Sequence, residues 1–267
     1  MTFWAEAISI DEIEGFERSS ANGTLRPSQN KTNLALIGSA RSSYGAECEK
    51  PTNPGFLKLV ETGDVGPFRT TGLRPAIDAL KRIMAEINSE RPTIYSLLRC
   101  EGMLGCRMVR GSTTAISNHS WGTAIDLSII GAKELPGPGM VQRGIMEIWP
   151  IFNRHGFYWG AAFPQADVMH FEASEQLIQK WAKAGAFGAV SVKGLIHRQT
   201  IGDRGQEIKD LQSALNGRLR AGYSTQTDIC EDGFFGIATR AAVVEFQRRQ
   251  GLFRDGIAGR KTHRALT

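Results

Sequence analysis

The chain has 267 residues, 41% of them hydrophobic and 22% charged, a balance that excludes intrinsic disorder and collagen-like repeats as global descriptions. No apolar run reaches the roughly 18 residues that a membrane-spanning helix needs. The net charge is +5, and residues 200–267 carry +3 of it (11 basic and 8 acidic side chains), which suits an anionic polymer. No Lys/Arg run exceeds two residues and no nucleic-acid-binding signature occurs, so we expect no nucleic-acid partner.

Apolar periodicity predicts three helices in the first two thirds of the chain. Residues 1–30 show little pattern, and the polar stretch 19–31 is expected to be a loop or an extended arm. Helical spacing covers residues 74–88 and again 139–155, the second helix ending at Gly156. A third helix is expected to begin after Ser174.

Short apolar runs between these helices predict strands at residues 93–98, 123–130 and 168–173. Helices and non-adjacent strands in this order predict an α+β domain with a small antiparallel sheet over residues 1–185. The Gly-rich stretch that follows predicts a linker over 186–200. The four cysteines form no Cys-x-x-Cys pair, which favours free thiols over a metal or redox motif, although a pair between Cys100 and Cys106 stays open.

Two histidines lie in informative surroundings. The first stretch is Ser-x-His-x-x-Gly-x-Ala-x-Asp, with His119 and Asp126, and the second is Asp-x-x-His-Phe-Glu, with His170. A hydrolytic zinc ion needs three protein ligands of these types and one open position for water. His119, Asp126 and His170 supply that set, and Glu172, two residues after His170 on the same strand face, is expected to orient a ligand.

Asp167 lies three residues before His170, which places it at the turn that enters the predicted strand. A carboxylate at this position can accept the proton of an attacking water, which a zinc ion acidifies to a pKa of about 7. We therefore assign Asp167 as the candidate general base.

These two stretches resemble the zinc motifs of the VanY-type family of D-alanyl-D-alanine carboxypeptidases and endopeptidases, which belongs to the wider group of lysostaphin-like peptidases and hedgehog domains. The resemblance extends over about residues 35–175. It implies a Zn²⁺ ion held by His119, Asp126 and His170, with Asp167 as general base. Family members also carry an arginine upstream of the first histidine that contacts substrate, for which Arg99 and Arg107 are the candidates here.

The last 67 residues repeat one pattern. Asp-Gly-x-x-Gly-x-x-Thr occurs at residues 232–239 and again at 255–262, with a helical segment between. Apolar stripes at Ile208, Leu211 and Leu215 and at Ala242, Val243 and Phe246 predict a small all-α three-helix domain over 201–267. This stretch resembles the helical peptidoglycan-binding domain attached to cell-wall hydrolases, and the resemblance implies binding to the bacterial wall.

Together the two resemblances predict a zinc metallopeptidase that hydrolyses stem or cross-link peptides of bacterial peptidoglycan. A D,D-carboxypeptidase of wall remodelling and a non-catalytic wall-binding phage structural protein are the alternatives. No paired carboxylates or other motif supports a glycan-cleaving enzyme.

The N-terminus lacks a basic region followed by an apolar core, so no secretory signal peptide is expected. This favours a phage endolysin, made in the cytoplasm and released to the wall by a separate pore. We expect a monomer.

Overall fold

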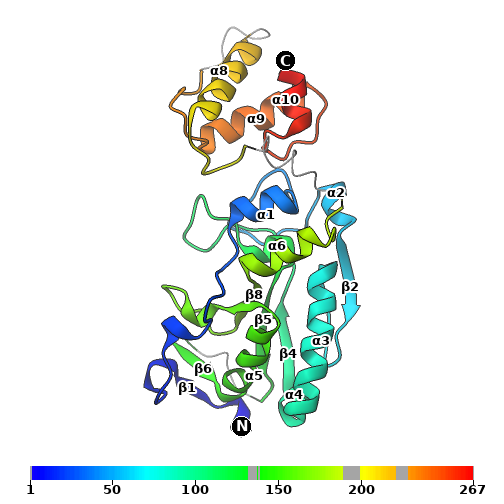
Figure 1. Ribbon diagram of the computed structural model, residues 1–267, viewed down its shortest axis with the longest axis vertical. Helices are drawn as coiled ribbons and strands as arrows, with labels where there is room; N and C mark the ends of the chain where they lie inside the picture. Colours follow the sequence, from blue (N-terminus) through cyan, green and yellow to red (C-terminus); the bar gives the residue numbers. More distant parts are fainter. Residues whose placement is uncertain (1, 132–136, 138, 189–198, 221–227, 267) are drawn as a thin grey trace. The chain divides into compact units, whose positions relative to one another are not determined.

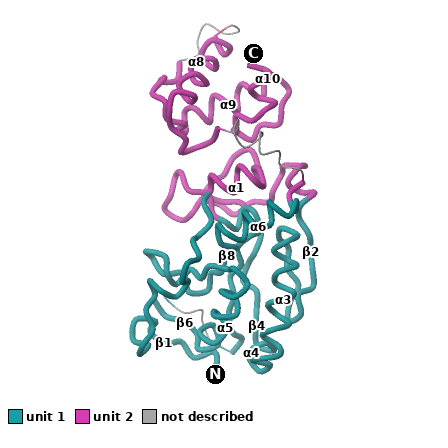
Figure 2. Tube along the Cα trace, viewed as in Figure 1, with its two compact units in different colours: residues 1–29, 59–105, 118–186 teal, residues 30–58, 106–117, 187–267 magenta. Residues whose placement is uncertain are grey.

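The computed structural model describes residues 2–131, 137, 139–188, 199–220 and 228–266. The chain separates into two compact units (Figure 2): residues 1–29, 59–105 and 118–186 form the first, and residues 30–58, 106–117 and 187–267 form the second. The second unit thus takes in two segments that lie within the predicted domain 1–185. Of the predicted linker 186–200, residues 189–198 lie outside the described part of the chain.

A four-stranded antiparallel sheet in the order β4–β5–β8–β7 is the centre of the first unit (Figure 1). Its strands are β4 (Leu98–Gly102), β5 (Ala124–Ile129), β8 (His170–Ala173) and β7 (Phe157–Trp159). Side chains alternate between the two faces of a strand, and the fully buried Ile125, Leu127 and Phe171 occupy the core face. The polar residues of the motifs therefore lie on the opposite face. The antiparallel sheet and the helices packed on it confirm the predicted α+β class.

Helices pack on this core as the apolar spacing predicts. Helix α3 (Arg74–Glu90) contacts the hairpin of β2 (Val60–Asp64) and β3 (Arg69–Leu73), while α5 (Arg143–Arg154) contacts β5 and β7. Gly156, with φ +83°, follows the end of α5 in the left-handed conformation expected of a helix-ending glycine. Helix α6 (Glu175–Lys183) begins after Ser174, whose hydroxyl accepts a hydrogen bond from the Leu177 N–H at 3.2 Å.

Three predicted elements differ from those observed. Residues 92–97 form helix α4 (Pro92–Leu97) instead of the predicted strand, because Pro92 has the backbone angle of a first helical turn and the strand β4 begins only at Leu98. Residues 140–142, within the predicted helix 139–155, form strand β6 (Met140–Gln142). The strand predicted at 168–173 begins at His170, because residues 168–169 form a turn.

The N-terminal residues, which carry little sequence pattern, belong to the first unit. Strand β1 (Ala7–Ser9) pairs with β6, and Ala5 and Ile10 are buried on either side of it. The short 3-10 turns η1 (Phe3–Ala5), η2 (Ile10–Glu12) and η3 (Arg18–Ser20) connect these residues. Residues 21–24 form a turn and residues 25–29 have no regular structure, which agrees with the loop or arm expected at 19–31 except at its ends, since residues 19–20 belong to η3 and residues 30–31 to a helix.

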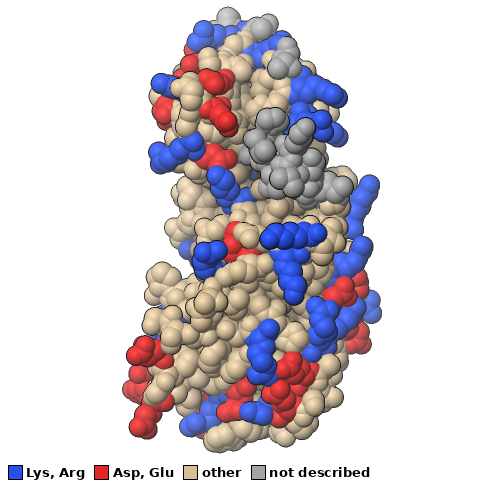
Figure 3. Space-filling view, in the orientation of Figure 1, with Lys and Arg blue, Asp and Glu red and all other residues tan. Residues whose placement is uncertain are grey.

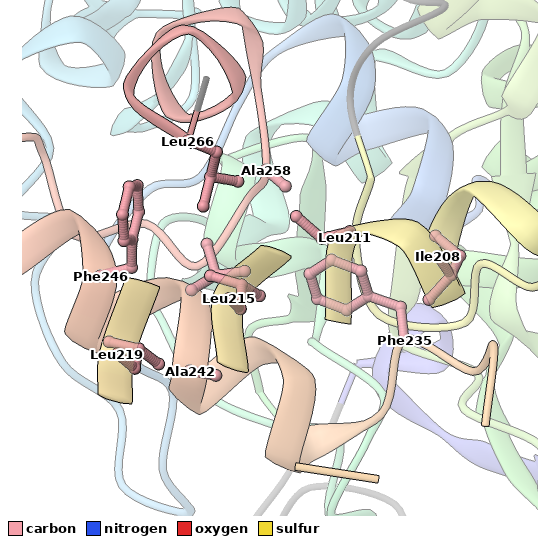
Figure 4. Close-up of a cluster of buried hydrophobic side chains, with 10 residues drawn as sticks. Ile208, Leu211, Leu215, Leu219, Phe235, Ala242, Phe246, Ala258 and Leu266 are labelled. Atoms are coloured by element: carbon pink, nitrogen blue, oxygen red, sulfur yellow. The ribbon is translucent and has the colours of Figure 1, made fainter. Parts of the chain in front are cut away.

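The second unit contains five helices within its described residues: α1 (Asn30–Leu36), α2 (Pro54–Leu57), α8 (Gln206–Arg220), α9 (Ile237–Arg249) and α10 (Arg260–Leu266). The last three enclose an apolar core in which Leu215, Phe235 and Phe246 are almost completely buried (Figure 4). This is the predicted three-helix domain, and the predicted apolar stripes on α8 and α9 form its core.

The repeated Asp-Gly motifs have the same hydrogen-bond network in both copies. The Gln212 amide donates to Asp232 Oδ1 at 2.9 Å and contacts Thr239 Oγ1 at 3.0 Å, and its carbonyl accepts from Gly233 N at 2.9 Å. Gln247 does the same with Asp255 (2.7 Å), Thr262 (3.1 Å) and Gly256 (2.9 Å). A buried glutamine thus fastens each turn to a helix, so the repeated residues have a structural role.

Three further observations concern the surface, the thiols and the helices. Basic and acidic side chains are interspersed over both units on the face drawn in Figure 3. All four cysteines are free thiols, as expected. Among the described helices, none has the length and apolarity needed to cross a bilayer.

Candidate metal centre

Three side chains from the two sequence motifs converge on the polar face of the four-stranded sheet. His170 on β8 lies directly opposite Asp126 on β5 in the antiparallel register. His119 comes from the 3-10 turn η4 (Asn118–Trp121), which precedes β5. Because residues paired across two strands project to the same face, the sheet brings two of these side chains together and the turn adds the third.

Gly122 allows the turn to lie close to the neighbouring hairpin. It has φ +60°, and a Cβ atom at this position would lie 2.7 Å from the Cα of Gly72. Its carbonyl accepts a hydrogen bond from Leu73 N at 3.0 Å. A side chain here would therefore push η4 away from β3, so the glycine of the motif is required by both its backbone angle and its close packing.

The atoms that face one another in this group are His119 Nε2, Asp126 Oδ1 and His170 Nδ1. The two nitrogens are 3.2 Å apart, and the oxygen lies 3.2 Å from His119 Nε2 and 3.1 Å from His170 Nδ1. Both histidines are buried, each with only 6% of its surface exposed. His119 Nδ1 lies 3.0 Å from the Met103 carbonyl, and donation to that oxygen leaves Nε2 with its lone pair toward the group.

Glu172 fixes the other histidine in a similar way. Its Oε2 lies 3.0 Å from His170 Nε2, so that donation from this nitrogen leaves Nδ1 as the electron-pair donor. The carboxylate is itself buried (2% exposed) and accepts hydrogen bonds from Ser28 N at 3.0 Å and Asn118 Nδ2 at 2.8 Å. Both oxygens of Glu172 therefore have hydrogen-bond donors from the protein and need none from water.

Burial works against charge in this group, but the side chains stabilise one another's charged forms. Desolvation raises the pKa of Asp126, yet the hydrogen bonds from His119 and His170 outweigh it and hold this pKa well below its usual range. Desolvation likewise lowers the pKa of His170, but Asp126 and Glu172 outweigh it and raise the pKa to about 10. The excess of carboxylate charge thus favours a cation at this position.

The candidate base, Asp167, lies on the loop that joins β7 to β8. The residue is exposed, and its backbone is fixed at both ends: its N–H donates to Gly160 O at 3.0 Å and its carbonyl accepts from His170 N at 3.3 Å. The structure therefore places Asp167 at the turn before the strand, with its backbone hydrogen-bonded to one of the clustered histidines.

The two candidate arginines lie in different units. Arg99 on β4 pairs in register with Ser128 on β5, two residues beyond Asp126, and so lies on the same face of the sheet. Its side chain is 66% exposed, with Nε 3.4 Å from Glu101 Oε1. Arg107 belongs to the second unit, where its guanidinium donates to Met108 O at 3.2 Å.

Several residues around the group are not indicated by the motifs. Asn118, which donates to Glu172, directly precedes His119 in the sequence, and its amide side chain is the one feature of the motif from which this contact could have been predicted. Ser28 and Met103 contribute only backbone atoms, which any residue type supplies, so the sequence carries no signal for them. Gly160 is required because a Cβ atom there would lie 2.6 Å from the Asp167 carbonyl oxygen.

The donor set fits a transition-metal ion. One carboxylate and two imidazoles, with all ligand atoms within 4.8 Å of one another, form the kind of group that binds Zn²⁺ in hydrolytic enzymes and leaves a further position open. The hydrogen bonds to Met103 and Glu172 supply the outer contacts that orient such histidine ligands.

Comparison with known families agrees with this geometry. Residues 110–173 match the family described as D-alanyl-D-alanine carboxypeptidase, a range that contains all three clustered side chains as well as Asp167 and Glu172. Residues 204–266 match the family described as putative peptidoglycan binding domain. No match was found among curated proteins or solved structures. The chain therefore combines a region that matches the D-alanyl-D-alanine carboxypeptidase family, which indicates a metallopeptidase, with a C-terminal region that matches the peptidoglycan-binding domain family.

Proposed function

We propose that this peptidase is zinc-dependent and hydrolyses peptide bonds in the stem or cross-link peptides of bacterial peptidoglycan. The observation that carries the proposal is the convergence of His119 Nε2, Asp126 Oδ1 and His170 Nδ1 within 4.8 Å on one face of the sheet. These three residues would hold the ion. When bound, Zn²⁺ supplies Lewis acidity, which polarises a carbonyl and lowers the pKa of water.

The protein's own residues have three further roles in this proposal. Asp167 accepts a proton from the attacking water and delivers it to the leaving amine, a role that suits an exposed carboxylate on the loop that leads into the His170 strand. Glu172 holds His170 in the tautomer that presents Nδ1. Arg99, on the same sheet face and largely exposed, binds a substrate carboxylate or carbonyl, and Arg107 is the second candidate for that contact.

The C-terminal domain would hold the enzyme on its substrate. Peptidoglycan is a polymer with closely repeated stem peptides, so attachment at one point raises the effective concentration of the next scissile bond. This tethering suits degradation of the polymer and therefore favours an endolysin-like endopeptidase over a carboxypeptidase.

The test is digestion of purified peptidoglycan followed by mass spectrometry of the fragments. We expect wild type and the His155→Ala control to generate new peptide ends, whereas His119→Ala generates none. His155 is a matched control because it too is a histidine with a carboxylate partner, Glu86, at 2.6 Å; it is half-buried and lies outside the ligand group. Cut sugars with intact peptides, or no cleavage by a zinc-loaded wild type, would contradict the proposal.

The same experiment separates the second candidate, a D,D-carboxypeptidase, which the description of the matched family favours. A carboxypeptidase releases only free terminal D-alanine and leaves the cross-links intact. An endopeptidase converts cross-linked dimers to monomers or cuts within the stem peptide and releases a part of it, so the masses of the released fragments distinguish the two.

A further inference from the structure

The N-terminal arm, taken here as residues 16–29 so that it includes η3, contacts β7 at the edge of the four-stranded sheet. Asn22 is almost completely buried, and its side chain pairs with both backbone groups of Trp159 on the edge strand β7: it accepts from Trp159 N at 2.7 Å and donates to Trp159 O at 3.0 Å. Further along, Ser28 N donates to Glu172. One arm thus contacts both the edge strand and the carboxylate that orients His170.

Arg18 connects this arm to the loop that carries Asp167. Its Nε donates to Ala161 O at 2.8 Å and its Nη2 donates to Phe163 O at 2.9 Å, so that one guanidinium holds two carbonyls of the same loop. The side chain is only 29% exposed. These carbonyls lie at the end of the turn η5 (Gly160–Ala162), where backbone oxygens lack helical partners.

The two carbonyls that Arg18 binds are close in the chain to Gly160, whose carbonyl accepts the hydrogen bond from the Asp167 N–H. The Asp167 N–H donates to Gly160 O, one residue before Ala161, and the loop closes where the Trp159 indole donates to Val168 O at 2.7 Å. The loop side chain Phe163 lies against His170, with 5.6 Å between ring centroids. A shift of the Arg18 contacts would therefore move the loop that sets the position of the Asp167 carboxylate.

We propose that Arg18 is a positioning residue for catalysis, which fixes the β7–β8 loop so that Asp167 lies where it can exchange protons with the reacting groups; this rests on the function of Asp167 proposed above. A planar guanidinium can donate to two carbonyls at once, whereas an ammonium group provides a single point of charge. Because displacement of a catalytic group by about 1 Å can cost roughly 100-fold in rate, loss of this fork lowers activity without removing any reacting group.

The test uses the full-length zinc-loaded protein with Arg18→Met and Arg18→Lys. We expect kcat on a soluble stem-peptide substrate to fall about 10- to 100-fold in Arg18→Met, with a smaller loss in Arg18→Lys. KM, zinc content and binding to purified peptidoglycan should stay near the wild-type values. Arg82→Met, at an exposed arginine on α3, is the matched control and should behave like wild type.

A double-mutant cycle with Asp167→Ala distinguishes positioning from general loss of structure. If Arg18 acts through Asp167, Arg18→Met should change the residual rate of Asp167→Ala by no more than about twofold. A full additional loss in the double variant, a wild-type rate in Arg18→Met, or loss of zinc from that variant would each overturn the inference. Wild-type cleavage by Asp167→Ala itself would instead refute the proposed base, and that single variant shows it independently of Arg18.

Discussion

Replacing Glu172 with glutamine is expected to weaken zinc binding while leaving the fold intact. The carboxylate faces three donors: Ser28 N, Asn118 Nδ2 and the Nε2–H of His170. A glutamine amide turns one of the two acceptor oxygens into a donor, so that in either orientation an N–H group opposes another N–H group. His170 then loses the acceptor that favours the Nδ1 lone pair.

The magnitude follows from the same contacts. A buried donor without a partner costs about 1–3 kcal/mol, which is the expected loss in the free energy of unfolding. Loss of an outer hydrogen bond to a metal-binding histidine weakens metal affinity about 10- to 100-fold. That range corresponds to about 1.4–2.7 kcal/mol of binding free energy.

Competition against a chromophoric chelator at constant pH measures the affinity, and thermal unfolding of the metal-free protein measures the stability. Glu175→Gln is the matched control, because Glu175 is another buried carboxylate that accepts a backbone hydrogen bond from the arm, from Gln29 N at 3.0 Å. It should lose similar stability but keep wild-type zinc affinity. Equal zinc affinities in Glu172→Gln and wild type, or an equal loss in both variants, would refute the role of Glu172.

Three other substitutions and one titration test separate parts of the structure. Asp167→Ala should retain zinc and wall binding but lose about 100-fold or more in peptide cleavage, as measured by release of new peptide ends. Gly160→Ala should lower the melting temperature and the cleavage rate together, because its Cβ would meet the Asp167 carbonyl at 2.6 Å. Gln247→Met should lower the free energy of unfolding of the C-terminal domain by about 2–4 kcal/mol, because the hydrogen bonds of Gln247 are lost. Calorimetry should then show this domain unfolding at a lower temperature, and the protein should no longer sediment with wall fragments. The exposed Gln250→Met is the control and should change neither measurement. Since zinc must displace the proton that His170 holds up to a pKa of about 10, apparent zinc affinity should rise about tenfold per pH unit between about pH 7 and 9.

The sequence predicts the elements that depend on local patterns and misses those that depend on distant backbone atoms. The spacing of His119, Asp126 and His170 identifies side chains that the structure brings within hydrogen-bond distance of one another, and their role as zinc ligands stays a prediction. Strand β5 lies within the short apolar run that predicts a strand at residues 123–130. The strand predicted at residues 93–98 is wrong, because a run of only six residues is too short for its apolar periodicity to distinguish a helix from a strand.

The N-terminal arm could not be predicted for a different physical reason. Its contacts are made by Arg18, Asn22 and the backbone of Ser28, each with a partner more than 130 positions away in the chain. Single polar residues in a loop carry no periodicity, and a backbone N–H carries no residue preference at all. Such contacts are visible only once the sheet edge that they cover has formed.

The charges of the centre explain how it can be assembled before a metal arrives. Without a metal, the half-buried Asp126 and the buried Glu172 would be two carboxylates in one site, and their repulsion is relieved by the proton that His170 keeps because of its raised pKa. That proton contributes stability fully below about pH 6.5, the ordinary pKa of histidine, and the contribution is lost as the pH rises through about 10. A divalent cation replaces the proton at the same nitrogen and adds one further positive charge, which the second carboxylate balances. On the proposed function, metal binding would therefore be an exchange of cations at His170, with the Glu172 contact already in place to orient that histidine.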